Sequence, residues 1–552
     1  MSNLAFIEGL LSRSSPEQVH SSLASLLPQN ATTAEKISAI EAALRSPAGR
    51  MLRAELGKLI VEKFVPVEAL VPLEYETWRP PVRDAMLYVV SHLSDTRLAP
   101  KLLEQIELPP NTPPETRLLR LIAKVPGLQK LGQVIARNRY LRPSLRVALS
   151  QLENGIRDVS AEEMCAIIRR ELGARIESFA VDIEPSILSE ASVSAVLRFT
   201  WNDPKTGERR RGVFKALKSY IPACFAEDME LLQGLADFFG LKHREYGLEK
   251  DVLTDTFTKV RRLLQHEVHF VGEQKTLVEA AALYGSLPRV RVPQIYQALC
   301  TSKVTAMSEE HGEKVTEAVA RMPARRRGQV AQQLIETLIA VPLFAPQENA
   351  LFHADPHAGN LFYDNQTGEL IILDWALTER LSREQRRHLA LLVLMVGLRD
   401  PIGACGEIQA LSQGGAVRRH SKQAKIIRET VADFFESLPL KWVPGAVDAM
   451  GLLQRTAAKG IRFASSLIML SKVLFTLDGV VADIRGSGVS MAYAVARHGL
   501  QSWLTIGSKA GLPLTLRDLM KVQCSAMLYG GRLSIKLEQT VLDKLLPRVS
   551  AH

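Results

Sequence analysis

The segment from Leu351 to Thr378 constrains the fold of this 552-residue chain more than any other part of it. It begins with a loop rich in His, Asp, Pro and Gly, and a helix predicted over Val330–Leu343 leads into that loop. Two strands are expected next, at Leu361–Tyr363 and Glu369–Leu373, because turn residues fill positions 364–368 between them. A helix, a loop and a β-hairpin in this order restrict where the polar side chains of the loop can point.

Three residues of this segment have the spacing of a phosphoryl-transfer centre. Asp355 and Asn360 lie five positions apart, as in a kinase catalytic loop, where the Asp orients the accepting hydroxyl and the Asn holds metal. Asp374 follows the hairpin, which returns the chain so that this carboxylate can face the same metal. An ordinary turn also uses Asp, Asn and Gly, but it does not require this order and spacing. Because magnesium prefers oxygen ligands, we expect His353 and His357 to make structural hydrogen bonds instead.

A lysine suited to phosphate contact lies in a second predicted hairpin. Ser192–Thr200 and Arg211–Leu217 are rich in strand-forming residues, and the turn residues Asn202–Gly207 separate them. Lys215 falls inside the second strand, where kinases place the lysine that bridges phosphate oxygens. A solvated lysine on an edge strand would be the default interpretation of Lys215 alone.

A helix glutamate is expected to orient Lys215, and two candidates lie in the helix predicted over Leu263–Leu283. On one helix, Glu267 and Glu273 would point about 240° apart, so a single face could not present both. The pattern alone does not choose between them. A glycine-rich phosphate loop is absent between Ile176 and Lys215, and small residues of Ser189–Ala195 occupy its place.

The composition is that of an ordinary globular protein, with 46% hydrophobic and 23% charged residues and enough length for two or more domains. The five cysteines are widely scattered, which argues against a disulfide framework or a zinc knuckle and favours a reducing compartment. The N-terminus has no signal-peptide pattern. We therefore expect a cytoplasmic protein, and the sequence does not indicate its oligomeric state.

The distribution of charge along the sequence bears on membrane and nucleic-acid contacts. The most apolar run, Phe463–Ile484, is interrupted by Lys472, Asp478 and Asp483, so no membrane-spanning helix is predicted. The net charge of +10 leaves peripheral contact with anionic lipid open. The basic runs lack interleaved aromatic residues, so nucleic-acid binding is not expected.

Together these residues resemble the UbiB (AarF/ADCK) family of atypical kinases. The family's H-A-D-P-H-P-G-N segment is present as His353–Asn360, with Ala358 in place of the second proline. Its K-x-G-Q motif is present as Lys130–Gln133, and Pro143 matches the proline that follows ten residues later. The resemblance covers roughly residues 120–485.

The resemblance implies roles for further residues. In the family the last glutamate of the helix pattern pairs with the strand lysine, which favours Glu273 as the partner of Lys215. The first, Glu267, is expected to face the segment that contains Lys130 and Gln133. Ala191 and Ser192 stand where the family has its alanine-rich nucleotide loop.

Several departures accompany the resemblance. Glu190 introduces an acidic group that is expected near the phosphates, and the family's D-F-G becomes Asp374-Trp375-Ala376. His269 replaces the helix aspartate. The Ser, Arg and Asp that usually follow K-x-G-Q appear as Ala136, Asn138 and Tyr140.

The expected fold is α+β: a two-lobed protein-kinase-like fold with helical N- and C-terminal extensions. The predicted divisions are a helical N-terminal region at 1–110, a K-x-G-Q extension at 111–175, a small lobe at 176–310, a large lobe at 311–485 and a helical C-terminal region at 486–552.

The resemblance implies an atypical kinase or ATPase that uses ATP and Mg²⁺ in support of ubiquinone or other isoprenoid-lipid metabolism. One alternative is a nucleotide-binding scaffold without turnover, which Glu190, Ala195 and Ala376 motivate. Another is an antibiotic or choline phosphotransferase, which shares Asp-x-x-x-x-Asn but lacks the K-x-G-Q extension.

Overall fold

The computed structural model divides the chain into two compact units. The N-terminal unit comprises residues 1–272 and 295–309, and the C-terminal unit comprises 273–294 and 310–552. The structure describes residues 18, 21–23, 25, 28, 30–136, 158–247, 250–285, 287–413, 421–439, 444–485, 495 and 514–529. The predicted positions Asn138, Tyr140 and Pro143 lie outside the described residues.

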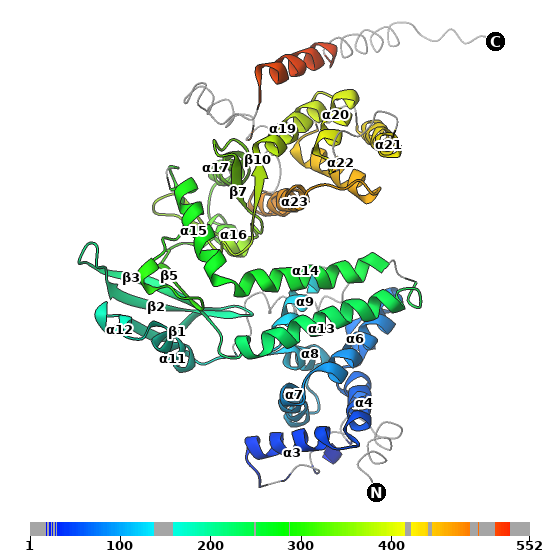
Figure 1. Ribbon diagram of the computed structural model, residues 1–552, viewed down its shortest axis with the longest axis vertical. Coiled ribbons are helices and arrows are strands. Elements are labelled where there is room, and N and C mark those ends of the chain that lie inside the picture. The colour runs from blue at the N-terminus through cyan, green and yellow to red at the C-terminus, as the bar shows by residue number, and fades with distance from the viewer. Residues whose placement is uncertain are drawn as a thin grey trace, which may run out of the picture. The chain divides into compact units, whose positions relative to one another are not determined.

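The N-terminal unit contains an antiparallel sheet in the order β1-β2-β3-β5 (Figure 1). Its buried face packs against α11 through apolar residues such as Ile168, Leu197 and Phe214. The strands are β1 (Asp182–Glu190), β2 (Ser194–Asn202), β3 (Arg209–Leu217) and β5 (Val304–Ser308). The hairpin predicted around the 202–207 turn is confirmed as β2 and β3. Leu197, Phe199 and Trp201 alternate into the core from β2, and Phe214 enters it from β3.

Strand β1 was not predicted. Its sequence contains Pro185, and bulges interrupt its pairing with β2 on either side of Ile187. An edge strand can accommodate both features, because one of its sides has no neighbouring strand to bond. The regular alternation that reveals a strand in sequence is therefore missing here.

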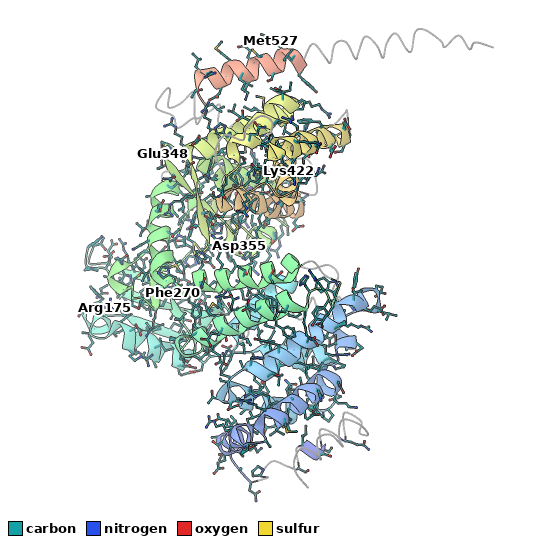
Figure 2. All side chains as sticks on the ribbon, turned by 45° about the vertical axis from the view of Figure 1, so that its right-hand side comes forward. Arg175, Phe270, Glu348, Asp355, Lys422 and Met527 are labelled. Carbon is teal, nitrogen blue, oxygen red and sulfur yellow. The ribbon has the colours of Figure 1, made fainter. Side chains whose placement is uncertain are left out.

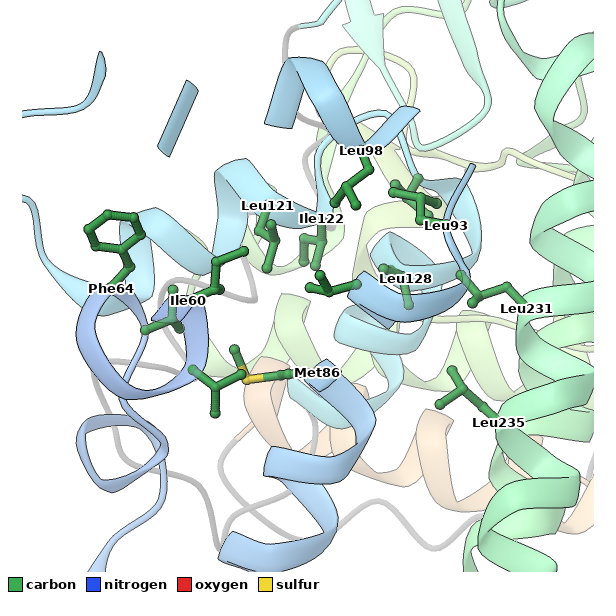
Figure 3. Packing of buried hydrophobic residues seen from close by; sticks show 14 of the residues in the cluster. Ile60, Phe64, Met86, Leu93, Leu98, Leu121, Ile122, Leu128, Leu231 and Leu235 are labelled. Carbon is green, nitrogen blue, oxygen red and sulfur yellow. The ribbon is translucent and has the colours of Figure 1, made fainter. Parts of the chain in front are cut away.

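The helices of the N-terminal unit bury a second core, which α13 and α14 share with the first 136 residues. Figure 3 shows side chains of this core, among them Leu98 from α7, Leu121 from α8 and Leu231 from α13. This packing sets α9, which carries the K-x-G-Q segment, against α13 and α14. The helices are α3 (Thr33–Arg45), α4 (Gly49–Leu59), α5 (Val67–Leu70), α6 (Arg79–His92), α7 (Asp95–Glu107), α8 (Pro114–Ile122), α9 (Pro126–Ala136), α11 (Ala161–Leu172), α12 (Arg175–Ser178), α13 (Ile221–Lys242) and α14 (Lys250–Val268).

A buried carboxylate joins these helices. Asp228 on α13 has no solvent exposure and accepts a hydrogen bond from the backbone N–H of Gly127, at 2.7 Å. Its other oxygen lies 2.7 Å from Nη2 of Arg97 on α7. The start of α9 is therefore tied to both α7 and α13.

The C-terminal unit contains two small sheets, with strand orders β4-β9-β8-β6 and β10-β7. The second predicted hairpin is confirmed as β8 and β9, which pair antiparallel, with Asp364 opposite Glu369 next to the turn. The strands are β4 (Val290–Arg291), β6 (Glu313–Lys314), β7 (Asn349–His353), β8 (Leu361–Asp364), β9 (Glu369–Ile372) and β10 (Thr378–Ser382).

Helices form most of the described part of the C-terminal unit after Ser382, as the sequence predicts. A capping box starts α19, in which the Ser382 hydroxyl accepts from the N–H of Gln385 and the Gln385 side chain accepts from the N–H of Ser382. The helices are α15 (Phe270–Tyr284), whose first residues belong to the N-terminal unit, α16 (Val315–Ala318), α17 (Ala324–Ile335), α18 (Val341–Leu343), α19 (Arg383–Gly397), α20 (Pro401–Leu411), α21 (Lys422–Ser437), α22 (Ala446–Ala458) and α23 (Ser465–Arg485).

The single helix predicted over 263–283 is wrong, because the chain leaves helical conformation at His269, between α14 and α15. The imidazole of His269 fills the space beside Gly272, where a Cβ atom would lie 2.5 Å from Nδ1. The estimate of 240° between Glu267 and Glu273 assumed one continuous helix, so it does not apply. Within the described residues, no helix is both long and apolar enough to cross a membrane.

Replacing Asp228 by Ala should destabilise the N-terminal unit. The change leaves the N–H of Gly127 without its buried acceptor and removes one of the carboxylates that pair with Arg97, at an expected cost of about 3 kcal/mol or more. Urea denaturation followed by circular dichroism measures the free energy of unfolding. Asp237→Ala, at an exposed position of the same helix, is the control and should change stability by less than about 0.5 kcal/mol. Equal stability of the two variants would contradict this role.

Candidate active site

The buried imidazole of His353 organises the loop that carries Asp355. His353 ends β7 and is 1% exposed. Its Nε2 lies 2.9 Å from the backbone oxygen of Asp374, and its Nδ1 accepts a hydrogen bond of 3.2 Å from the backbone N–H of Asp355. Burial lowers the pKa of His353, which favours the neutral ring that this donor and acceptor pattern needs. His353 thus links the backbones of the two carboxylate residues and has the structural role expected for it.

Asn360 is held by the same loop. Its side-chain nitrogen donates to the backbone oxygen of Asp355 at 3.2 Å, within a short helical turn at Ala358–Asn360. His357 starts that turn, and its Nδ1 accepts from the N–H of Gly359. The amide oxygen of Asn360 receives no hydrogen bond from the residues that the structure describes. This side chain could offer a ligand oxygen to a cation.

Asp374 adopts a left-handed backbone conformation, with φ of 52°, directly after the second hairpin. Asp tolerates this conformation better than most residues, and such positions concentrate at functional sites. The next residue, Trp375, is 1% exposed and packs edge-on against His353, while its indole N–H donates to Ile372. Ala376 donates its backbone N–H to Oδ1 of Asp374 at 3.2 Å. Trp375 therefore anchors the segment, and the Asp374 side chain remains exposed.

Lys472 contacts the predicted catalytic carboxylate. Its Nζ lies 3.3 Å from Oδ1 of Asp355, and it projects from α23, 117 positions later in the chain. The side chains of Lys472 and Asp355 are 28% and 23% exposed, so the pair is only partly desolvated. Figure 2 labels Asp355 in the loop after β7. The sequence drew attention to Lys472 only as a charge inside an apolar run, and a lysine in such a helix is the signal that could have marked it.

In the N-terminal unit, Lys215 lies on β3 opposite Val196 and Thr305 of the neighbouring strands. Its Nζ stands 5.6 Å from the ring centre of Phe270, which is fully buried. An aromatic face at this distance attracts an ammonium group and limits its motion. The strand lysine is therefore positioned by cross-strand pairing and by an aromatic neighbour.

The structure brings together Lys130, Glu267 and Ser192, three of the predicted site residues. Lys130 on α9 forms an ion pair with Oε1 of Glu267 on α14. The Ser192 hydroxyl, in the turn between β1 and β2, donates to Oε2 of the same carboxylate at 3.0 Å. Glu267 thus faces the K-x-G-Q segment, as the resemblance implies, and joins it to the turn that replaces a glycine-rich loop.

Glu190 does not present an exposed charge in that turn, which corrects the expectation drawn from its sequence position. Its side chain is 3% exposed, and Oε1 lies 2.8 Å from Nζ of Lys218. Lys218 is fully buried and also pairs with Asp158 at 2.8 Å. The backbone N–H of Asp158 donates to Glu190 at 3.0 Å. This cluster fixes the start of the turn from inside. No motif or spacing in the sequence marks Lys218 or Asp158 as its members.

The remaining predicted residues are placed as follows. Ala191 is exposed in the β1–β2 turn, where its N–H donates to Ser194 at 2.8 Å. Gln133 lies three residues after Lys130 on α9. Glu273 is buried in the first turn of α15, where the helix dipole favours a carboxylate. The pairing of Glu273 with Lys215 stays a prediction.

The segment that carries most of these residues matches a known family. Residues 151–404 match the model of the ABC1 atypical kinase-like domain. The chain therefore contains an ABC1 atypical kinase-like domain. Relatives of low identity that are named as probable protein kinases UbiB support the UbiB resemblance. The two-lobed kinase-like class, with helical extensions, is thereby confirmed.

The relatives that this chain resembles are distant. An uncharacterized protein of Synechocystis sp. is 22% identical over 452 residues, which cover 78% of this chain and 74% of that protein. A probable protein kinase UbiB of Actinobacillus pleuropneumoniae is 22% identical over 398 residues, 71% of each chain. A Mycobacterium tuberculosis protein solved in complex with erythromycin aligns with a TM-score of 0.44 and 16% identity, over 69% of this chain and 95% of its own.

Replacing His353 by Leu should destabilise the C-terminal unit by about 2 kcal/mol or more. The apolar side chain removes the hydrogen bonds that the buried ring makes to the backbones of Asp355 and Asp374, and each such bond contributes about 0.5–1.5 kcal/mol. Urea denaturation measures the loss. His311→Leu, at an exposed position, should change stability by less than about 0.5 kcal/mol. If the two variants were equally stable, His353 would not hold the loop.

Proposed function

We propose that the chain is an ATP- and Mg²⁺-dependent atypical kinase or ATPase of the UbiB type. The observation that carries the proposal is the loop around Asp355, in which His353 ties the predicted catalytic carboxylate to the predicted metal ligand Asp374. Phosphoryl transfer needs positioning and charge stabilisation more than covalent chemistry. A pre-organised loop of this kind supplies both.

Each residue has a role in this proposal. Asp355 orients and accepts the proton of the attacking hydroxyl or water, and Lys472 aligns its carboxylate through the 3.3 Å contact. Lys215 contacts the phosphates, while the turn at Ala191 and Ser192 covers them. Bound Mg²⁺ neutralises phosphate charge, and ATP supplies the phosphoryl group.

The donor set suits magnesium. Asp374 offers an exposed carboxylate. The side-chain nitrogen of Asn360 donates to the backbone oxygen of Asp355, which leaves the amide oxygen of Asn360 for a ligand. Magnesium prefers a few hard oxygen ligands supplemented by phosphates and water. These two residues would hold it without further protein ligands.

The UbiB resemblance extends the proposal to the acceptor. We infer a small or lipid-linked acceptor, in support of ubiquinone or other isoprenoid-lipid metabolism. The ion pair between Lys130 and Glu267 favours this over an antibiotic or choline phosphotransferase, because those enzymes lack the K-x-G-Q extension.

Magnesium and ATP should together raise the melting temperature of the wild-type protein. A ligand that binds only the folded state at 100 times its Kd stabilises by about 2.7 kcal/mol. Differential scanning fluorimetry with ATP, with and without Mg²⁺, measures the shift. Asp374→Ala should lose most of the magnesium-dependent part, and an equal shift in that variant would contradict the metal assignment.

A measurement of ATP turnover distinguishes an enzyme from a scaffold that binds ATP without using it. Phosphate release from ATP should be lost in Asp355→Asn, whereas wild-type protein that binds ATP without releasing phosphate would support the scaffold.

Lys472→Met should lower kcat at least about tenfold with little change in KM, because Lys472 acts through Asp355. Lys472→Arg should restore part of the rate, and Lys459→Met, on the exposed end of α22, should not alter it. Wild-type kcat in Lys472→Met would rule out the positioning role.

A further inference from the structure

A cavity of about 980 Å³ lies among the N-terminal helices. Its walls come from α3, α7, the end of α8 and the start of α13, which Figure 1 labels in the N-terminal unit, and from residues 158–160, which precede α11. Most of its lining residues precede residue 151, so they lie outside the matched kinase-like domain. The volume is at the upper end of the range for small-molecule sites.

The wall is mostly apolar, with side chains such as Ile37, Leu103 and Val159. Four carboxylates also line it, and each already has a basic partner in an ion pair. These pairs are Glu104 with Arg120 at 3.6 Å, Glu107 with Lys36 at 3.0 Å, Glu227 with Arg97 at 3.2 Å and Asp158 with Lys218 at 2.8 Å.

Lys101 on α7 has no such partner. It lines the cavity, is 8% exposed, and donates from Nζ to the backbone oxygen of Ala123 at the end of α8. No carboxylate among the described residues forms an ion pair with it. Lys124, which also lines the cavity, is exposed and likewise has no carboxylate partner in the described part of the chain. A lysine is rarely buried without a carboxylate in direct contact with its ammonium group.

The surroundings of Lys101 disfavour its charged form. Burial lowers its pKa to about 7, and the nearby cations of Arg97 and Lys124 act in the same direction. Glu104 and Asp228 act in the opposite direction and only partly offset the loss of hydration. An anion placed beside Nζ would therefore stabilise the ammonium form.

We propose that this cavity binds a single-chain amphiphile with an anionic head group, whose head contacts Lys101 and whose chain lies along the apolar wall. The two unpaired lysines supply the charge complementarity. The apolar side chains supply a surface for the hydrocarbon chain, which a small ionic ligand would leave uncovered. This site is independent of the nucleotide site proposed above.

Isothermal titration of the full-length protein with laurate below its micelle concentration tests the proposal. One laurate should bind per chain. Dodecyltrimethylammonium, which has the same chain and the opposite charge, and acetate, which has the head alone, should bind at least about tenfold more weakly. Equal binding of laurate and the cationic amphiphile would overturn the proposal, and so would no laurate binding.

Lys101→Met keeps the apolar length of the side chain and should weaken laurate binding at least about tenfold. Lys58→Met, an exposed position on α4 that does not line the cavity, is the matched control and should bind as the wild type does. Ala223→Trp, at an exposed position of the cavity wall, should block binding without removing charge, so it decides the matter if Lys101→Met does not fold. Wild-type affinity in folded Lys101→Met or in Ala223→Trp would refute the site.

The affinity should also depend on pH. Above pH 7, Lys101 of the ligand-free protein loses its proton, so laurate can pair with it only if the side chain takes up a proton on binding. The affinity for laurate should therefore fall more than about tenfold between pH 7 and pH 9. The pKa of Cys224, which also lines the cavity, is raised by burial to about 11, so its thiol does not titrate in this interval. A flat profile in the wild type would contradict the role of Lys101. Binding to anionic phospholipid vesicles without binding to monomeric laurate would instead indicate a membrane-facing surface and overturn the cavity assignment.

Discussion

The hydrogen bonds of one buried imidazole determine the geometry on which the proposed chemistry depends. His353 receives the N–H of Asp355 on one ring nitrogen and contacts the carbonyl of Asp374 with the other. These two residues are 19 positions apart, and the β8–β9 hairpin between them closes the loop. Because the imidazole is buried and its pKa is lowered, it keeps one donor and one acceptor nitrogen. These two contacts hold the backbones of Asp355 and Asp374 in fixed positions relative to each other.

A comparable polar junction organises the N-terminal unit. Glu267 joins Lys130 of the K-x-G-Q helix to Ser192 in the β1–β2 turn. Lys218 and Glu190 fix the start of the same turn from the interior. Polar contacts of this kind restrict the conformations of the segments that they join. Side-chain hydrogen bonds and ion pairs thus order this turn, whereas a glycine-rich loop becomes ordered when it wraps around phosphates.

The two hairpins and the polar loop were predictable because their signals are local. Turn residues at 202–207 and 364–368 sit between runs of strand-forming residues, and the spacing from Asp355 to Asn360 is fixed in sequence. Strand β1 was missed because Pro185 and two bulges hide its alternation. The break at His269 was missed because helical periodicity continues across it and only the close approach to Gly272 reveals it. Lys472 and Lys218 act through residues far away in the chain, which no local pattern encodes.

We propose that Asp355, Asn360 and Asp374 form the metal and catalytic centre of a nucleotide site, and that Lys215 contacts the phosphates. A structure of the protein with Mg²⁺ and a non-hydrolysable ATP analogue tests it most directly. We expect the metal between the amide oxygen of Asn360 and the carboxylate of Asp374, Lys215 on the phosphates, and Lys130 still paired with Glu267. Phosphate contacts from Lys130 in place of Lys215, or a metal bound away from Asp374, would contradict the account.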